Sequence, residues 1–463
     1  MILSMKGTII AYALAISSCL AQLDRQGETR TYLVQYKKDV RGAENSLEYL
    51  QSRGALMISE RFPSIGVNLV KMTDNEALKV ASRNDIAAVE LNIDNYQVLG
   101  WLDPVQPQDT QDGQRKLSEE IPYGIAMVRA GEGNDGNLYL PNTDIVSPKK
   151  VCVIDSGYIN NHEDLPTLDA TDGHSTIPGN VWSKDGCGHG THCAGTIGAL
   201  GGNEKGVIGV IGDETKLDLF IVRVFDDDCF WGSEEGLIGA VEKCIEAGAD
   251  IVSMSIGSDL DSQFEADQFK KHYNDDNVLF IAAAGDDGDS GMTYPASHPH
   301  VMSVAAVDED ENRAHFSQFN SQVEISGPGV NVISTYKGDY KSMSGTAMAT
   351  PYVAGVAALV WGHHPECTNK QIRHALVKSA RVKAGDGKCD DKYGFGIVDA
   401  WQAYLMISEL GCDGVVDNTG EILGGCAFVE GGLGPSNCKN WCKEITIPWN
   451  GLVGTTQKCD FTE

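Results

Sequence analysis

A carboxylate and a histidine stand in settings that suit acid–base chemistry. Asp155, in Asp155-Ser156-Gly157, directly follows the apolar strand predicted at residues 151–154 and begins a turn. A carboxylate held in such a turn can orient a histidine and stabilise its charged form. His189 lies in the small-residue stretch 185–196 (DGCGHGTHCAGT).

The same stretch allows a second interpretation as a metal site. His189, His192 and Cys193 have a spacing that a metal ion could use. A structural zinc site needs four ligands, however, and no fourth ligand lies nearby in the sequence. We therefore expect His192 to be structural and Cys193 to be a buried thiol beneath His189.

Residues 341–360 (KSMSGTAMATPYVAGVAALV) join a turn of small residues to a helix that is apolar on every face. Such a helix is a buried helix. Pro351 is tolerated near its start, because the first backbone N–H groups have no partner within the helix. The turn therefore brings one residue to the positive end of a buried helix, which favours developing negative charge.

Together these stretches resemble the signatures of the subtilisin-like serine peptidases (peptidase family S8), and of the proteinase K-like members especially. The chain order of aspartate, histidine and nucleophile is that of subtilisin. The resemblance implies that Asp155 orients the base, that His189 is the general base, and that the nucleophile follows Thr346. That position is Ala347, so the nucleophilic serine is missing.

Two further segments resemble the binding elements of this family. Ser255-Ile256-Gly257 resembles the segment that pairs with an extended substrate, for which main-chain hydrogen bonds give affinity and pockets give selectivity. Ala283-Ala284-Gly285-Asp286 resembles the segment that ends in the oxyanion-hole asparagine. The resemblance implies substrate contacts at residues 255–257, Ala284 and Gly285, and it puts Asp286 in the place of the asparagine.

Asp286 and Ala347 both weaken the expected catalysis. In subtilisin, loss of the oxyanion-hole asparagine costs about 10²–10³ in turnover. An ionised aspartate repels the oxyanion, although a protonated one could donate to it, and some relatives tolerate aspartate here. Loss of the serine costs roughly 10⁶ in turnover. Ser344 lies up to about 10 Å upstream along an extended chain, too far to replace it.

Asp164 and Asn203 occupy positions that resemble a calcium site near the start of the main domain. Hard oxygen ligands from separated loops suit calcium. Ordinary surface loops are the alternative interpretation. The expected chemistry requires no cofactor, so calcium would have a structural role.

The elements that must position these residues lie in residues 119–405. Continuous apolar runs, such as 151–154, 251–255 and 278–284, alternate there with helical segments. This pattern predicts a parallel sheet covered by helices on both faces, with ligands at the carboxyl ends of the strands. The expected fold class is α/β, a subtilisin-like parallel sheet sandwiched by helices.

Residues 30–95 carry a β-α-β-β-α-β rhythm that predicts a ferredoxin-like α+β domain, expected to span residues 22–100. Its first helix is expected at residues 43–51, and Thr73 and Glu76 form the capping box of its second. The domain resembles the inhibitory propeptide that precedes subtilisin-like domains. Residues 101–118 are expected to be a polar linker.

Both ends of the chain differ from the middle. Residues 1–21 resemble a secretory signal, with a lipoprotein box at Cys19 as the alternative. Residues 406–463 form a small Cys-rich segment with five cysteines, so one of these should pair with the main domain or stay free. A disulfide-held tail is the simpler interpretation. A carbohydrate- or surface-binding module using Trp441 and Trp449 is the other.

Charge and cysteine content narrow the class of protein. The chain has 36 basic and 65 acidic residues, which argues against a nucleic-acid partner. No stretch other than the leader is apolar enough to approach a membrane span. Removal of the leader leaves 12 of the 13 cysteines, an even number that suits an oxidising compartment. We expect a secreted, extracellular protein.

The sequence therefore predicts a secreted subtilisin-like pseudoprotease that binds extended peptide, with its own propeptide domain as a further partner. The alternative is an active secreted subtilisin-like serine endopeptidase, in which Ala347 is an error, an engineered change or a bypassed position. The two predictions share a fold and differ in the chemistry at residue 347.

Overall fold

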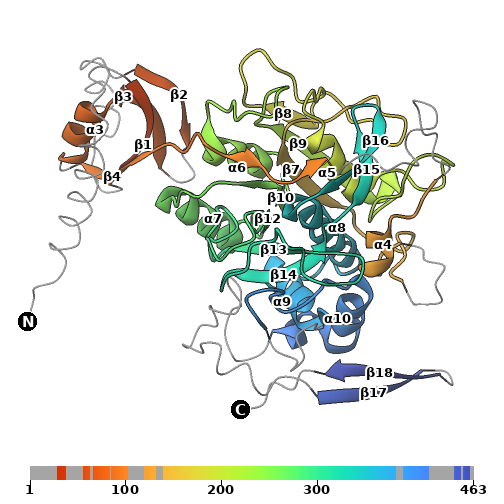
Figure 1. Ribbon diagram of the computed structural model, residues 1–463. Helices are drawn as coiled ribbons and strands as arrows, with labels where there is room; N and C mark the ends of the chain where they lie inside the picture. Colours follow the sequence, from red (N-terminus) through yellow and green to blue (C-terminus); the bar gives the residue numbers. More distant parts are fainter. Residues whose placement is uncertain are drawn as a thin grey trace, which may run out of the picture. The chain divides into compact units, whose positions relative to one another are not determined.

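The computed structural model describes residues 29–37, 56–62, 66–83, 85–102, 119–131, 139–381, 389–416, 443–449 and 452–458. The chain divides into two compact units, Met1–Asn92 and Ile93–Glu463. Figure 1 shows both, with the first unit in orange and red. The predicted signal (1–21) and the predicted helix at 43–51 lie outside the described residues.

The first unit contains a four-stranded antiparallel sheet in the order β2-β3-β1-β4. Its elements are β1 (Thr29–Tyr36), β2 (Leu56–Phe62), β3 (Val67–Thr73), α3 (Asp74–Ala81) and β4 (Ile86–Leu91). The Thr73 side chain accepts from the Glu76 amide, and the Glu76 carboxylate accepts from the Thr73 amide. This capping box starts α3 at the predicted place.

The second unit is built on a seven-stranded parallel sheet in the order β14-β13-β12-β10-β7-β9-β8. The strands are β7 (Lys149–Asp155), β8 (Gly173–Ser175), β9 (Leu217–Arg223), β10 (Ile251–Met254), β12 (Leu279–Ala283), β13 (Val301–Val307) and β14 (Val323–Pro328). The central strands are buried throughout, because helices cover both faces. The predicted α/β fold class is confirmed.

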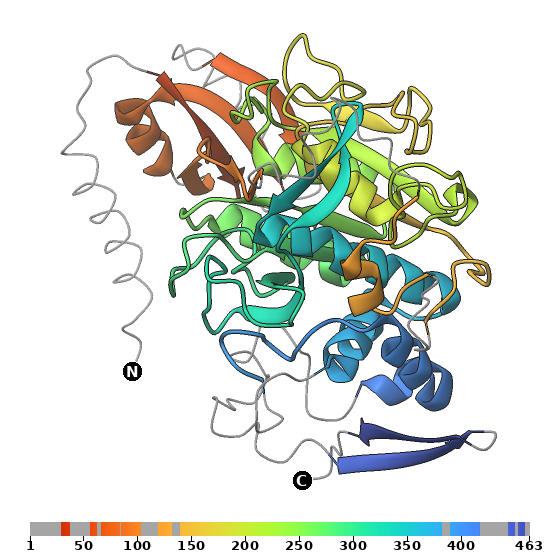
Figure 2. The same ribbon diagram turned by 45° about the vertical axis from the view of Figure 1, so that its right-hand side comes forward.

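Helices α6 and α7 cover one face of this sheet, and α5 and α8 cover the other (Figures 1 and 2). The helices are α4 (Tyr123–Met127), α5 (His189–Gly198), α6 (Gly236–Glu246), α7 (Gln263–Asp275), α8 (Thr346–His363), α9 (Asn369–Ser379) and α10 (Ala400–Val415), with a 3-10 turn η2 (Glu214–Lys216). Residues 346–362 of α8 are buried on every side, which agrees with the apolar sequence of this helix. None of the helices in the described part of the chain is both long and apolar enough to cross a membrane.

Short strands complete the second unit. They are β5 (Gln97–Val98), β6 (Trp101–Leu102), β11 (Ile256–Gly257), β15 (Val332–Tyr336), β16 (Asp339–Ser344), β17 (Lys443–Trp449) and β18 (Leu452–Lys458). β5 pairs with β11, and β6 extends the β15–β16 hairpin at the β16 edge. The two pairings lie on either side of Leu99 and Gly100.

Two predicted boundaries differ from the structure. The segment from Ile93 to Leu102, which was divided between the propeptide-like domain and the linker, belongs to the second unit. Its strands β5 and β6 are two residues long, too short to show a period in the sequence. Their position is set by the strands they pair with. The predicted boundary at 405/406 falls inside α10, which continues to Val415. The predicted binding residue Trp441 lies outside the described residues.

Three disulfides join described cysteines: Cys152–Cys244, Cys187–Cys229 and Cys367–Cys412. Cys389 is also disulfide-bonded, and Cys193 is a buried free thiol. Cys412 is one of the five cysteines of the predicted tail, and Cys367 belongs to the main domain. The expectation that one tail cysteine pairs outside the tail is therefore confirmed.

Candidate active site

Asp155 and His189 meet at the carboxyl end of the central sheet. Asp155 is the last residue of β7, and His189 is the first residue of α5. His189 Nδ1 lies 2.7 Å from Asp155 Oδ1, and both side chains are buried. The structure thus brings together the residue predicted to orient the base and the residue predicted to be the base, which are 34 residues apart in the chain.

Asp185 holds the two loops in register. Its Oδ1 accepts from Ser156 Oγ (2.8 Å) and from the Gly188 amide (2.7 Å). Its Oδ2 accepts from the amide (2.9 Å) and the hydroxyl (2.7 Å) of Thr191, in the first turn of α5. A carboxylate at a helix N-terminus satisfies donors that have no partner within the helix. Asp185 therefore fixes where α5 begins and, with it, where His189 lies.

Charge decides the protonation of His189. Burial is the largest single influence and lowers its pKa, but Asp155 and Cys193 together outweigh burial and raise the pKa well above the ordinary histidine value. The hydrogen bonds agree, because Nδ1 faces a carboxylate oxygen and Nε2 faces the Leu99 carbonyl oxygen at 2.8 Å. Both ring nitrogens face acceptors and must donate. Since both nitrogens face acceptors, His189 must release the proton on Nε2 before it can act as a general base.

Ala347 lies in the first turn of α8, where the family signature places the nucleophile. Its side chain is a fully buried methyl group. Its carbonyl oxygen accepts from Ser255 Oγ at 2.8 Å, and Cys193 Sγ lies 3.9 Å from the same oxygen. Burial raises the pKa of the Cys193 thiol, so it stays neutral. Neither residue supplies a nucleophile.

Asp286 follows β12 and reaches the start of α8. Its Oδ1 accepts from the Thr346 amide (2.7 Å) and from Thr346 Oγ1 (2.8 Å), while Oδ2 is buried and the Gly100 backbone N–H faces the carboxylate. Burial raises the pKa of Asp286 to about 6, although the hydrogen bonds from Thr346 oppose this. At neutral pH the group is mainly ionised, so it stabilises the N-terminus of α8 and disfavours an oxyanion.

Gly285 and Ala284 shape the wall beside Asp286. Gly285 has φ 112°, and a Cβ there would meet the Gln318 side chain at 1.3 Å, so only glycine fits. Its amide donates to Thr346 Oγ1 at 3.1 Å. Ala284 is buried and its amide donates to Val304 O. The segment is thus locked between β13 and the start of α8.

The chain's own segment 97–102 runs through this site as the short strands β5 and β6, with Leu99 and Gly100 between them. The Leu99 amide donates to Ser255 O at 3.3 Å, and Val98 and Gln97 pair with Ile256 and Gly257. A Cβ on Gly257 would lie 2.9 Å from the Leu99 side chain, so the glycine leaves room for it. The predicted binding segment therefore does pair with an extended strand.

Beyond Gly100, which has φ 97°, the chain continues as β6. Trp101 pairs with Ser344, and the Trp101 ring packs edge-on against Phe316 with centroids 4.6 Å apart. The Leu99–Gly100 peptide bond therefore lies between His189 and the start of α8. The Leu99 carbonyl oxygen is bonded to His189 Nε2, the nitrogen that would otherwise serve a nucleophile.

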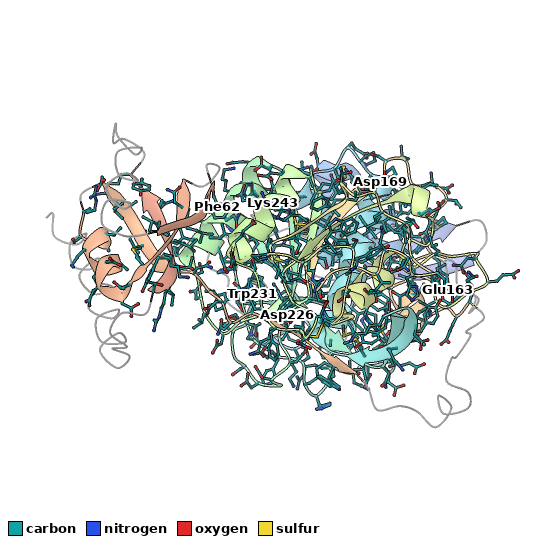
Figure 3. All side chains as sticks on the ribbon, turned by 90° about the horizontal axis from the view of Figure 1, so that it is seen from above. Phe62, Glu163, Asp169, Asp226, Trp231 and Lys243 are labelled. Carbon is teal, nitrogen blue, oxygen red and sulfur yellow. A yellow bond between two sulfur atoms is a disulfide. The ribbon has the colours of Figure 1, made fainter. Side chains whose placement is uncertain are left out.

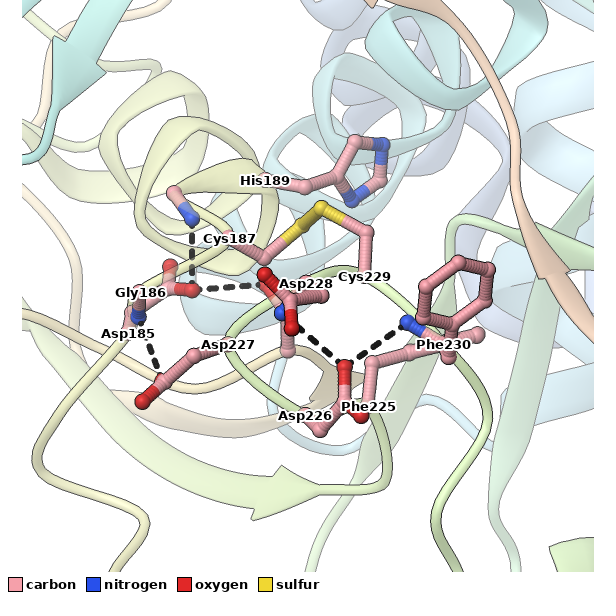
Figure 4. Close-up of a disulfide and its surroundings, with 12 residues drawn as sticks. Asp185, Gly186, Cys187, His189, Phe225, Asp226, Asp227, Asp228, Cys229 and Phe230 are labelled. Carbon is pink, nitrogen blue, oxygen red and sulfur yellow. Dashed lines mark hydrogen bonds between the residues drawn. A yellow bond between two sulfur atoms is a disulfide. The ribbon is translucent and has the colours of Figure 1, made fainter.

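A disulfide fastens the histidine loop to the loop at residues 226–231 (Figure 4). Cys187 lies two residues before His189 and is bonded to Cys229. Nearby, Asp227 Oδ1 accepts from the Gly186 amide at 3.0 Å and from Arg223 at 2.7 Å. Hydrogen bonds from Arg223 are the main reason that the pKa of Asp227 is lowered. Asp227, in the acidic run 226–228, therefore has a structural role beside the site.

His192 and Ser344 do not take the alternative roles considered from the sequence, whereas His189 and Cys193 lie with Asp155 in a buried group whose possible ligand atoms are within 4.8 Å of one another. His192 Nε2 lies 3.0 Å from Val332 O and 3.1 Å from Lys341 O, so it faces backbone carbonyls instead of a shared metal position. Ser344 Oγ accepts from the Asn331 amide at 2.8 Å and belongs to β16. The expected structural role of His192 agrees with these contacts.

Asp164 and Asn203 do meet, as an amide–carboxylate pair. Asp164 Oδ1 accepts from Asn203 Nδ2 (2.7 Å) and Oδ2 accepts from the Val207 amide (2.9 Å). Asn203 Oδ1 accepts from the Lys205 amide. Burial raises the pKa of Asp164 to about 6. Because N–H groups occupy these oxygens, the arrangement does not fit a calcium ion as it stands, and calcium binding stays a prediction.

Comparison with known proteins identifies the family. The model of the subtilase family (Peptidase S8) matches residues 148–396. The chain belongs to the subtilase family. A thermostable alkaline protease of Halalkalibacterium halodurans is 33% identical to it, in an alignment that covers 81% of this chain and 92% of that protease. Subtilisin BL of Lederbergia lenta is 38% identical to it, in an alignment that covers 61% of this chain and 98% of subtilisin BL.

A solved structure agrees with this assignment. The crystal structure of a psychrophilic subtilisin-like protease from an Antarctic Pseudoalteromonas species superposes with a TM-score of 0.56 at 27% identity. The superposition covers 64% of this subtilase and 99% of the other chain. The subtilisin-like fold predicted from the sequence is therefore confirmed.

Sequence reasoning missed several residues that build this subtilase site. Asp185 was quoted in the histidine motif, but its place just before the helix start was the only signal of its positioning role. Leu99 and Gly100 gave no signal, since they contact the site through backbone atoms. The polar pair Tyr96 and Glu265, hydrogen-bonded at 2.6 Å, is separated by 169 residues and was also missed.

Proposed function

We propose that this subtilase is a catalytically impaired family member that binds an extended peptide strand without cleaving it. Ala347 carries the proposal. A methyl group at the start of α8 has no oxygen with which to attack a carbonyl, and loss of the serine costs roughly 10⁶ in turnover in subtilisin. Asp286 adds an ionised group where a negative charge would develop.

Strand binding survives this change because it uses backbone atoms. The hydrogen bonds from β11 and Ser255 to residues 97–99 need neither a nucleophile nor an oxyanion hole. Strand addition of this kind draws its affinity from main-chain bonds and its selectivity from pockets. The binding function therefore does not depend on the residue at 347.

In this proposal residues 97–102 are the resident ligand of the groove, and the first unit is a retained propeptide-like partner. Because the strand is part of the chain, its effective concentration at the groove is high, and an external peptide must compete with it. Binding of the strand also stabilises the native state, as any ligand of that state does.

An active endopeptidase remains the second candidate, and the intact Asp155–His189 pair favours it. In that case Ala347 would be an error, an engineered change or a position that the reaction bypasses. Labelling of the protein as purified separates the two candidates, because only the active form reacts.

We propose further that the protein is exported. Support comes from the disulfides Cys152–Cys244, Cys187–Cys229 and Cys367–Cys412. Disulfides persist in oxidising compartments and are rare in reducing ones. Fractionation of the native host, with immunodetection of the medium and the cells, tests this proposal.

The deciding experiment measures reactivity and binding on one preparation. The full chain should not react with a fluorophosphonate probe or release fragments from denatured casein. It should bind a subtilisin-directed protein inhibitor in calorimetry. Stoichiometric labelling would overturn the non-cleaving assignment, and absence of inhibitor binding up to millimolar concentration would overturn the binding assignment.

A further inference from the structure

Tyr96, the residue just before the resident strand, places its side chain in a pocket that is polar at its floor. Tyr96 lies three residues before Leu99 and is 2% exposed. Its ring packs on Trp231 with centroids 4.8 Å apart, and Trp231 packs edge-on against Phe225. Trp231 is labelled in Figure 3, on the loop that the Cys187–Cys229 disulfide fastens. The pocket wall is therefore tied to the active site.

The floor of the pocket is a buried carboxylate. Glu265, in the first turn of α7, is 3% exposed, and its Oε2 accepts from the Tyr96 hydroxyl at 2.6 Å. His298 is also buried, with Nε2 3.7 Å from the same oxygen and no hydrogen-bond partner. A buried carboxylate needs donors, and the ligand's hydroxyl supplies one.

We infer that this pocket makes the groove selective for tyrosine, resting on the proposed peptide-binding function. The preferred ligand is an extended peptide with an unmodified tyrosine three residues before an apolar residue at His189. A phenylalanine in its place would leave Glu265 Oε2 buried without the hydroxyl donor. A phosphotyrosine would bring two negative charges to the carboxylate. Sites built to bond a hydroxyl strongly reject analogues that lack it.

Neighbouring contacts set the register for this side chain. Ser258 Oγ donates to Asn95 Oδ1 at 2.7 Å, next to the pairing of Gln97 with Gly257. The β5–β11 pairing therefore fixes which ligand residue faces the pocket, and Glu265 selects that residue by accepting a hydrogen bond from its hydroxyl. Selectivity from the side chain and affinity from the backbone are separate, so each can be tested alone.

The first experiment keeps the strand in place and measures hydrogen exchange of the Leu99 amide in the full chain. Y96F should speed this exchange on the order of 10- to 100-fold when Glu265 is present, the range expected for a hydrogen bond to a charged group. In the E265L background Y96F should have less than about a threefold effect, and E265Q should lie between. An equal effect of Y96F in all three backgrounds would overturn the inference.

The second experiment supplies the ligand from outside. Fluorescent peptides with the sequence of residues 93–102 (IDNYQVLGWL) and with tyrosine replaced by phenylalanine or phosphotyrosine are titrated into the full-length Y96A chain. The tyrosine peptide should bind about tenfold or more tightly than either analogue, and E265L should remove its advantage over phenylalanine. Equal binding of the three peptides would overturn the tyrosine selectivity and leave the proposed function standing. No binding of any peptide to a folded Y96A chain would overturn the proposed function itself.

Discussion

At the residue scale, the site combines a hydrogen-bonded Asp155–His189 pair with an alanine and an aspartate at the two positions that weaken catalysis in the proposed function. Asp155 and His189 lie in hydrogen-bond contact, whereas Ala347 has no nucleophilic atom and Asp286 holds an ionised oxygen near the start of α8. Asp286 also accepts from the Thr346 amide, so it has a structural role that an oxyanion-hole donor need not have. The two changes act on the same intermediate, and their effects should not add.

The first prediction is that A347S alone restores little activity. At pH 8, above its pKa of about 6, Asp286 is ionised and opposes the oxyanion. The double variant A347S/D286N keeps an oxygen acceptor for Thr346 and adds an amide donor. Its turnover on denatured casein should exceed that of A347S by about 10²–10³. Equal turnover of the two variants would show that Asp286 is no handicap.

The second prediction concerns the charge of His189. Because Asp155 raises its folded-state pKa above the unfolded value, the charged form stabilises the folded protein. That contribution is fully present below the unfolded pKa, about 6.5. It disappears as the pH rises through the folded pKa. The difference in unfolding free energy between the wild type and H189Q should therefore be largest at acidic pH and shrink in alkaline solution.

A direct measurement accompanies this prediction. The Hε1 resonance of His189, assigned by its loss in H189Q, should titrate well above the ordinary histidine value in NMR spectra. An unshifted titration midpoint would contradict the imidazolium assignment, and with it the view that His189 Nε2 donates to Leu99 O.

At the element scale, the site depends on how loops after β7, β10 and β12 converge on the starts of α5 and α8. Asp185 and Asp286 each accept amide protons at one of these helix starts. The Cys187–Cys229 disulfide joins the α5 loop to the loop that carries Trp231. This disulfide should therefore matter for position as well as for stability.

The third prediction separates these two effects. The double variants C187A/C229A and C367A/C412A remove disulfides with sequence separations of 42 and 45 residues, so each should lower the unfolding free energy by about 2–4 kcal/mol. Only C187A/C229A should also speed hydrogen exchange at Leu99, since Cys367–Cys412 joins α10 to the segment before α9. Similar exchange in both variants would contradict a positioning role for Cys187–Cys229.

The sheet, α8 and the Asp155–His189 pair were predictable, because apolar runs and short motifs report them locally. The strands β5 and β6 were not, because two residues carry no period and their conformation is set by β11 and β16. Likewise, nothing local marks Glu265 as the partner of Tyr96. Asp286 was predicted to oppose an oxyanion, but its cap on α8 depends on packing that the sequence does not display.

At the scale of the whole molecule, the groove and its resident strand belong to one chain. Residues 97–102 lie in the second unit, whereas the sheet β1–β4 forms the first. A subtilase with a serine in the groove could cut the strand at the bond that His189 faces. In the proposed function Ala347 prevents this cut, so the strand should stay continuous and compete with any external peptide for the groove.

The fourth prediction is that the residues at 347 and 286 keep the chain continuous at the Leu99–Gly100 bond. Protein made in a protease-deficient host should show, by intact mass, no cut at the Leu99–Gly100 bond. The A347S/D286N variant should cut that bond, because the Leu99 carbonyl already lies beside His189. Its products are a fragment that ends at Leu99 and a chain that begins at Gly100. Adding H189A to that variant should abolish the cut.

Cleavage of the wild-type chain at this bond would reveal a nucleophile other than residue 347 and would end the non-cleaving proposal. Cleavage of the double variant only within residues 103–118 would place the reactive bond elsewhere and contradict the register of the resident strand.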